Sequence, residues 1–175
     1  MYNVAIGHNA GLSVTTGTLN TLVGSLIGDA LTTGNENTAI GYQALTSETK
    51  GNRNVAVGNN ALSSQNNATN TSSYNTAVGY NAGSSTTTGV QNTILGALAG
   101  DALTTGSFNV ALGYNALSAE VAGGRNIAIG YFSLANQNNA GANYNVAIGH
   151  AAGQQVTTGI ENTIIGGLAG DALTT

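Results

Sequence analysis

One short phrase, repeated along the whole chain, limits the possible folds more than any other feature of this sequence. The phrase starts with Asn, and an aliphatic residue and a Gly stand at its fourth and fifth positions. The copies start at residues 3, 20, 37, 54, 75, 92, 109, 126, 145 and 162. The spacing is thus 17 in seven of the nine intervals, and 21 and 19 in the other two. Such a period predicts that each copy forms one unit of a stacked array.

The copies also follow a longer period of four. The second and sixth copies read NTLVGSLIGDALTTG and NTILGALAGDALTTG, and the hexapeptide NVAIGH opens both the first and the ninth copy. The two longer intervals each close a block of four, with the extra residues in 63–74 and 135–144. We interpret residues 1–175 as a single repeat array. Because the last copy stops part-way, we expect a segment of a longer fibre.

The pattern within each copy favours strands over helices. Positions 2 and 4 are Val, Thr, Ile or Leu around a mostly small position 3, which is the alternation of a short strand. A unit this short, with its turns marked by Gly, has no room for a pair of helices. The sequence therefore predicts an all-β fold, a parallel β-roll or β-solenoid of about ten coils stacked at about 4.8 Å, which gives a rod of roughly 48 Å.

Stacking accounts for a composition with only 6% charged residues. In a parallel stack each residue lies above its equivalent in the next coil, so repeated charges repel, whereas Asn amides can bond from coil to coil. Gly supplies unusual backbone angles or close approach. We predict two structural ladders. One consists of Asn3, Asn20, Asn37, Asn54, Asn75, Asn92, Asn109, Asn126, Asn145 and Asn162, and the other of Gly7, Gly24, Gly41, Gly58, Gly79, Gly96, Gly113, Gly130, Gly149 and Gly166.

The apolar content of one copy is small, which predicts self-association. Each copy offers one large aliphatic residue at position 4, a Val or Thr at position 2 and usually Ala at position 3. Several chains around a shared axis bury more apolar surface than one chain, so we expect a homotrimer. Leu26, Leu98 and Leu168 replace the Asn or Gln of other copies, as core variation or as a lateral hydrophobic band.

The phrases NVAIGHNA, NTAIGYQA, NVAVGNNA and NTAVGYNA give the consensus N-x-A-[IV]-G-x-x-A. This consensus resembles the head repeats of trimeric autotransporter adhesins, the YadA-like heads, and it is similar to repeats in the tail fibres of phages and related viruses. The resemblance covers all ten copies, although these copies are longer than the usual compact head repeat. It implies a left-handed parallel β-roll with three chains around one axis, extracellular, on a bacterial cell surface or a virion fibre.

The sequence lacks the residues that several classes of function need. Only Lys50, Arg53 and Arg125 are basic, too few for a nucleic-acid surface, and there is no Cys for thiolate chemistry. No apolar stretch is long enough to span a membrane. No nucleophile, phosphate-loop or metal motif occurs, so we expect a non-enzymatic protein with no cofactor and no metal site. The Asp of the repeated GDAL phrase fits a turn, with calcium as the alternative.

Two groups of residues are candidate contacts with a ligand. Position 6 is aromatic or His in six copies, which suits stacking on sugars if the row faces outward. These residues are His8, Tyr42, Tyr80, Tyr114, Tyr131 and His150. The longer loops break the regularity of the rod in the same phase, and their candidate contacts are Gln65, Asn67, Asn70, Gln137 and Asn139.

The leading functional hypothesis is a structural and adhesive segment of a surface attachment fibre, with surface glycans or host surface proteins as partners. A trimeric rod presents each contact several times and gains avidity. The alternatives are a shaft without a ligand, a solenoid that binds ice through a flat Thr face, and a fibre that cleaves polysaccharides. The last needs a carboxylate pair, and Glu36, Glu48, Glu120 and Glu161 show no repeated pairing.

Overall fold

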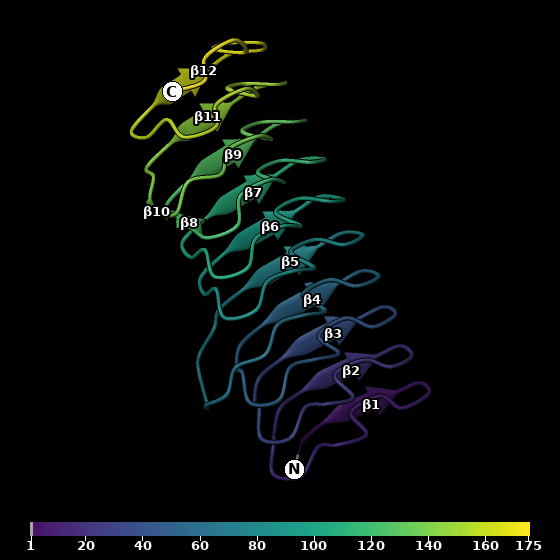
Figure 1. Cartoon of the computed structure of the whole chain (residues 1–175). Coiled ribbons are helices and arrows are strands. Elements are labelled where there is room, and N and C mark those ends of the chain that lie inside the picture. Colours follow the sequence, from purple (N-terminus) through teal and green to yellow (C-terminus); the bar gives the residue numbers. More distant parts are fainter. Residues whose placement is uncertain (1) are drawn as a thin grey trace.

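The computed structural model describes residues 2–175 as one β-solenoid without helices, in which each copy of the repeat forms one coil and contributes one short strand to a common sheet (Figure 1). The strands of this sheet are β1 (Val4–Ile6), β2 (Thr21–Val23), β3 (Thr38–Ile40), β4 (Val55–Val57), β5 (Thr76–Val78), β6 (Thr93–Leu95), β7 (Val110–Leu112), β9 (Ile127–Ile129), β11 (Val146–Ile148) and β12 (Thr163–Ile165). Two short strands, β8 (Gly123–Gly124) and β10 (Gly141–Ala142), form a separate parallel pair.

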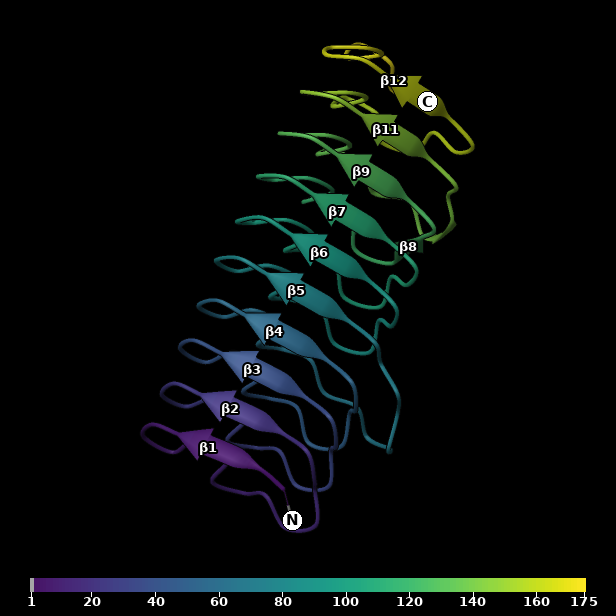
Figure 2. The same ribbon diagram turned by 180° about the vertical axis from the view of Figure 1, so that it is seen from behind.

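The ten strands pair in parallel and in sequence order, with each position directly beside the same position of the next copy. Val4 pairs with Thr21 at one end of the stack, and Ile148 pairs with Ile165 at the other. Seen from behind, the strands run as evenly spaced rungs (Figure 2). The prediction of an all-β solenoid of about ten coils, with one coil for each copy of the repeat, is confirmed.

The side chains that fill the inside of the coil come from position 3, not from positions 2 and 4. Ile94 is fully buried, while the next residue, Leu95, is 44% exposed. The side chain of position 1 Asn points inward, so strand alternation sends positions 2 and 4 outward. The aliphatic residue of position 4 therefore lies on the outer face of the sheet, where a single chain leaves it at least partly exposed.

In seven of the ten copies one of positions 3 and 9 is Leu or Ile and the other is Ala or Gly, whereas both are small in the first, fifth and ninth copies. Leu22 at position 3 lies against Gly28 at position 9, and a Cβ added to Gly28 would stand 3.0 Å from a Leu22 methyl carbon. In the next copy the sizes are reversed, with Ala39 at position 3 and Leu45 at position 9, both buried. The space between these two positions holds one large side chain, and a second would overpack it.

The turns between strands need backbone angles that few residues adopt. Gln43, Leu45 and Arg53, at three corners of the same coil, all have φ between 54° and 61°. Gly96, at the end of its strand, has φ of 138°, and a Cβ there would lie 2.4 Å from the carbonyl oxygen of Gly113 in the next coil. The Gly ladder therefore marks close backbone contact between successive coils.

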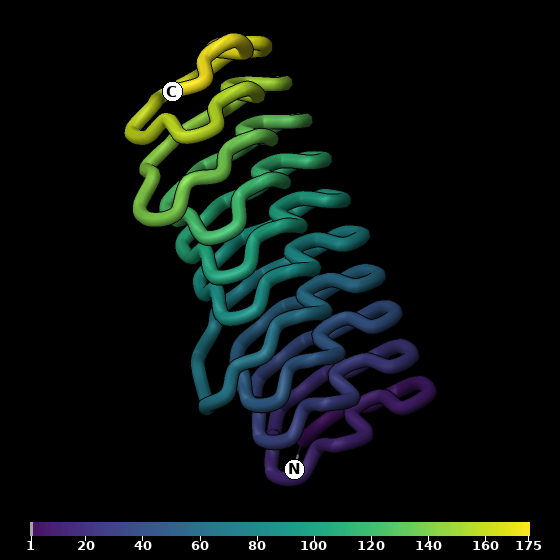
Figure 3. Tube along the Cα trace, in the orientation of Figure 1, coloured from purple at the N-terminus to yellow at the C-terminus, as the bar shows by residue number. Residues whose placement is uncertain are grey.

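The two longer copies interrupt an otherwise regular stack. The loop of the fourth copy extends farther from the strands than the loops of the preceding coils (Figure 3). Its chain returns to the third coil, where Ser72 forms an isolated parallel bridge with Asn52. The loop of the eighth copy returns in the same way, through the β8–β10 pair. Both extensions are anchored on the coil before them.

Candidate functional site: the outer face of the sheet

The outer face of the ten-stranded sheet carries the side chains of positions 2 and 4, which we call the aliphatic rows. In the middle of the stack, position 4 is 44% exposed at Leu95 and 37% exposed at Leu112. The in-register pairing places these side chains in straight rows along the rod. Position 4 is aliphatic in all ten strands, whereas position 2 is Thr in five of them. A single chain seldom leaves an apolar row of this length open to water, so this face is a candidate contact surface.

The Asn ladder fixes the inner side of the same strands. Asn92 donates from its side-chain Nδ2 to the side-chain oxygen of Asn75 at 3.2 Å and to the carbonyl of Gly106 at 3.0 Å. Its own side-chain oxygen accepts the backbone N–H of Asn109 at 3.0 Å. The pattern repeats from Asn3 to Asn162 with local exceptions, so each coil is bonded to the next by buried amides.

Position 6 forms an aromatic row at one edge of the sheet, and its side chains are exposed. The structure brings three of the six candidate residues together. Tyr114 and Tyr131 stack with ring centroids 5.4 Å apart, and Tyr131 and His150 stack at 5.3 Å. Phe132 packs edge-on against both tyrosines of this stack.

The other three candidates of the aromatic row stand apart from this stack. His8, Tyr42 and Tyr80 are exposed, but each is separated from the next aromatic member by a copy with Ser25, Asn59 or Ala97 at position 6. They can contact a ligand only singly. The stack of Tyr114, Tyr131 and His150 is therefore the strongest aromatic feature of this face.

A second row was missed by the sequence analysis. The last residue of each copy lies just before the Asn ladder, at a corner with positive φ, and its side chain lies at the opposite edge of the outer face. We call it the closing row. Its members are Leu19, Glu36, Arg53, Tyr74, Gln91, Phe108, Arg125, Tyr144 and Glu161. The signal was available in the sequence, because two Arg and two Tyr recur there with the period of four copies.

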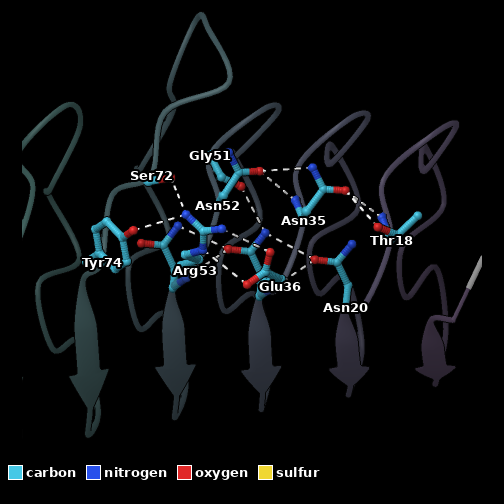
Figure 4. A network of polar contacts seen from close by, with 11 residues as sticks. Thr18, Asn20, Asn35, Glu36, Gly51, Asn52, Arg53, Ser72 and Tyr74 are labelled. Atoms are coloured by element: carbon cyan, nitrogen blue, oxygen red, sulfur yellow. Dashed lines mark hydrogen bonds and ion pairs between the residues drawn. The ribbon is translucent and has the colours of Figure 1, made fainter.

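In the first block the closing row forms a closed polar cluster (Figure 4). Arg53 donates from Nε and Nη2 to the two carboxylate oxygens of Glu36 at 3.1 and 3.2 Å. Its Nη1 donates to Ser72 at 2.9 Å and to the Tyr74 hydroxyl at 3.0 Å. The hydrogen bond to Glu36 raises the pKa of Arg53 above its usual value. The Arg53 and Glu36 side chains are exposed, so the cluster contributes little to stability.

In the second block the closing row holds a different arrangement. The Arg125 guanidinium carbon lies 5.0 Å from the centre of the Phe108 ring and 5.7 Å from that of Tyr144. These distances are in the range of cation–π contacts. The Arg side chain is thus held between two aromatic rings at the same place in the repeat where Arg53 meets a carboxylate.

The prediction that Gln65, Asn67 and Gln137 contact an outside ligand is wrong, because their side chains are buried inside the coil. Gln65 and Asn67 donate to the carboxylate of Glu48, each at 2.9 Å. The longer loops lack the Thr-Thr-Gly turn, and these amides replace it by bonding inward. Asn70 is exposed and Asn139 is partly so, which leaves them as the accessible members of the predicted set.

Two buried carboxylates hold the turns that precede the longer loops. Glu48 accepts the backbone N–H of Thr49, Lys50 and Gly51 through one oxygen, at 2.7 to 3.1 Å. Glu120, one block later, accepts Val121 N–H at 3.0 Å and Gly123 N–H at 2.7 Å. The two acids belong to different blocks and each binds its own turn, so they make no catalytic pair.

Burial raises the pKa of Glu120, and the hydrogen bonds from the turn N–H groups oppose that rise only in part. The network around it is also less complete than the one at Glu48. Among residues 2–175, the side-chain oxygen of Asn143 and the side-chain nitrogen of Gln137 have no hydrogen-bond partner. Gln65, the equivalent of Gln137 in the first block, donates to its carboxylate.

The described part of the chain shows no pocket and no group of three His, Asp or Glu side chains placed to hold a metal ion. None of its segments is a helix with the length and hydropathy needed to cross a membrane. No protein-family model, curated protein or solved structure matches the chain. The candidate functional features of the described residues are therefore surfaces of the solenoid.

Proposed function

We propose that this chain is a non-enzymatic segment of an extracellular attachment fibre, in which three copies pack their aliphatic rows around a shared axis. The observation that carries the proposal is the outward orientation of the aliphatic residue at position 4 in every coil. The core of the single chain is already filled without the position 4 residues. Their aliphatic character in all ten coils is therefore explained by contact with something outside the chain.

The dimensions of the outer face support self-association. Ten strands spaced at about 4.8 Å, each about 10 Å long, give a face of roughly 480 Å² before side-chain relief is counted. That value lies within the range of the largest apolar patches on ordinary monomers, which are often functional. Three such faces turned toward one axis remove most of this area from water, and the resemblance to trimeric adhesin heads favours three copies over two.

The aromatic row supports an adhesive role over that of a bare shaft. The exposed stack of Tyr114, Tyr131 and His150 offers ring faces and edges at one border of the outer face. Sugars present C–H groups that pack on such rings, and a trimeric rod presents each row three times. We propose surface glycans as the ligand class of this row.

The native mass, measured by light scattering on a size-exclusion column, tests the assembly. We expect three times 17.3 kDa. Leu95→Asp and Leu112→Asp place charges in the aliphatic rows and should reduce the mass to that of one chain. Val121→Asp is the matched control, because Val121 is 38% exposed but lies outside these rows. A wild-type mass of one chain would remove the trimer from the proposal.

Binding to a glycan array tests the adhesive role. Tyr131→Ala removes the centre of the stack and should abolish binding to the glycans that the wild type retains. Tyr42→Ala deletes the same side chain where it stands alone, and should leave most of the signal. Equal loss in both variants, or no glycan binding by the wild type, would leave a structural shaft as the function.

A second candidate function is ice binding by a single chain. The observation that favours it is the straight, in-register outer face, on which position 2 is Thr in five of ten strands. These Thr side chains share the face with the aliphatic residues of position 4. Thermal hysteresis of the purified monomer would support this function, and its absence would exclude it.

A further inference from the structure

The two complete blocks of four copies place an Arg at the same corner but surround it differently. Arg53 and Arg125 have φ of 61° and 63°, so their backbones are alike. Tyr74 and Tyr144 follow them in the closing row of the next coil. The first block therefore serves as an internal reference for what this corner does when its polar partners are present.

The second block lacks two of those partners. Phe108 stands where the first block has Glu36, and Ala142 stands where it has Ser72. In residues 2–175 the Arg125 guanidinium takes part in no ion pair, and its contacts are the two rings of Phe108 and Tyr144. All five N–H donors of this side chain are thus available, while four of the five donors of Arg53 are occupied.

The surroundings of Arg125 keep its donor edge accessible. Arg125 itself and both flanking rings are exposed, with Phe108 at 46% and Tyr144 at 53%. The neighbouring β8–β10 pair consists of Gly and Ala only, and a Cβ built on Gly141 meets no atom within 4 Å. A guanidinium flanked by two rings has fewer orientations to lose, which reduces the ordering cost of binding a ligand.

We propose that Phe108, Arg125 and Tyr144 form a binding site for the carboxylate of an acidic saccharide, such as a sialic or uronic acid unit. This inference rests on the proposed adhesive function and names a ligand class for it. The site is distinct from the aromatic row, because it lies at the opposite edge of the outer face, on the other side of the three-residue strands.

The carboxylate is chosen because the chain shows how this edge binds one. Glu36 takes the Nε–Nη2 edge of Arg53 through both oxygens, in the bidentate geometry that suits carboxylates. A sugar is favoured over a peptide acid because two exposed rings flank the donors and can pack on the C–H groups of a pyranose ring. The net charge of −4 argues against general attraction of anions, so binding must come from the local geometry.

The repeat itself supplies the variants that test the site. Phe108→Glu copies the first block and should close the site, because the new carboxylate occupies the Arg125 edge. The double variant E36F/S72A copies the second block and should open an equivalent site at Arg53. Gln91→Glu is the control for charge, since it adds the same acid to the closing row two coils from Arg125, about 10 Å away.

Each protein, in the assembly it forms in solution, is titrated by NMR with sialyllactose, a glucuronate disaccharide, lactose and polyglutamate. We expect the acidic sugars to bind the wild type, and Phe108→Glu to weaken them at least about tenfold, the loss typical of a charged hydrogen bond. Gln91→Glu should change affinity by less than about twofold by the screening of exposed charges. The E36F/S72A variant should bind about twice as many equivalents of acidic sugar per chain as the wild type, because it would carry two like sites.

Three results would overturn the inference: unchanged acidic-sugar binding in Phe108→Glu, polyglutamate binding as tightly as the sugars, and no binding of acidic sugars by the wild type. The relative response to sialyllactose and the glucuronate disaccharide identifies which sugar acid the site prefers. Neutral glycans report on the aromatic row, so a wild type that binds lactose but no acidic sugar would leave the proposed function intact and remove this site alone.

Discussion

Truncating one member of the Asn ladder should destabilise the chain by an amount that depends on how many buried groups lose their partner. In Asn92→Ala, the carbonyl of Gly106 and the backbone N–H of Asn109 both lose their hydrogen bond to the side chain. Each buried group left without a partner costs about 1–3 kcal/mol. The expected loss in the free energy of unfolding is therefore about 2–6 kcal/mol.

Asn126 belongs to the same ladder but supports fewer groups. Its side-chain nitrogen has no partner among residues 2–175, and its side-chain oxygen accepts only the N–H of Asn145, at 3.3 Å. Asn126→Ala should therefore cost about 1–3 kcal/mol, since one group is orphaned. Asn59→Ala is the control, because Asn59 is exposed at position 6, and it should change stability by about 0.5 kcal/mol or less.

Urea unfolding followed by circular dichroism measures the three variants against the wild type. A solenoid can unfold in parts, so the slope of the transition is compared together with its midpoint. The order Asn92, Asn126, Asn59 in decreasing cost is the expected result. If Asn92→Ala and Asn59→Ala differed by less than about 0.5 kcal/mol, the ladder would be a by-product of stacking and not a source of stability.

Two further predictions concern the coil backbone and a buried acid. Gly96→Ala should destabilise the chain far more than Gly141→Ala in the same urea assay. Both residues have positive φ, but only Gly96→Ala would place a Cβ against the next coil. Equal losses of stability would show that the backbone angle alone sets the cost. Burial raises the pKa of Glu120 above its ordinary 4.5, so the folded chain binds this proton more readily than the unfolded chain does. The stability that the protonated carboxyl contributes is complete below pH 4.5 and is lost as the pH rises through the raised pKa. Glu120→Gln should therefore flatten the decline in stability with pH. Glu161→Gln changes an exposed residue and should leave that decline unchanged.

The repeat period was enough to predict the stack, since a parallel in-register array follows from ten equivalent copies. The side of the strand that faces the core was harder to derive. Hydrophobicity favours Leu95 over Ala111 as a core residue, yet Ala111 is buried and Leu95 is exposed. The inward Asn of position 1 decides the alternation, and its preference for buried carbonyl partners is visible only once the coil is closed.

The loops show a similar limit of sequence reasoning. Polar residues in an extended, Asn-rich segment suggest exposure, but Gln65 and Gln137 are buried. They replace a turn that the longer copies lack: Gln65 donates to Glu48 of the coil before, and Gln137 accepts from Asn145 of the coil after. Long-range partners of this kind leave no local pattern.

The exchange of size between positions 3 and 9 gives a prediction about the core itself. Leu22→Ala should cost about 2–5 kcal/mol, the usual range for a fully buried Leu. Gly28→Leu alone should also destabilise, by about 1–3 kcal/mol, because the added side chain meets Leu22. The double variant L22A/G28L reproduces the Ala39 and Leu45 arrangement of the next coil, so we expect it to recover more than half of the loss of L22A.

The backbone allows this exchange without strain, because Gly28 has φ of 49° and Leu45 holds the equivalent corner at 56°. The coupling between the two substitutions, obtained from a double-mutant cycle in urea, should therefore be favourable and exceed about 1 kcal/mol. Additive costs would mean that each coil is packed by its neighbours above and below more than by its own residues. A favourable coupling would establish that positions 3 and 9 of one coil share a single packing space.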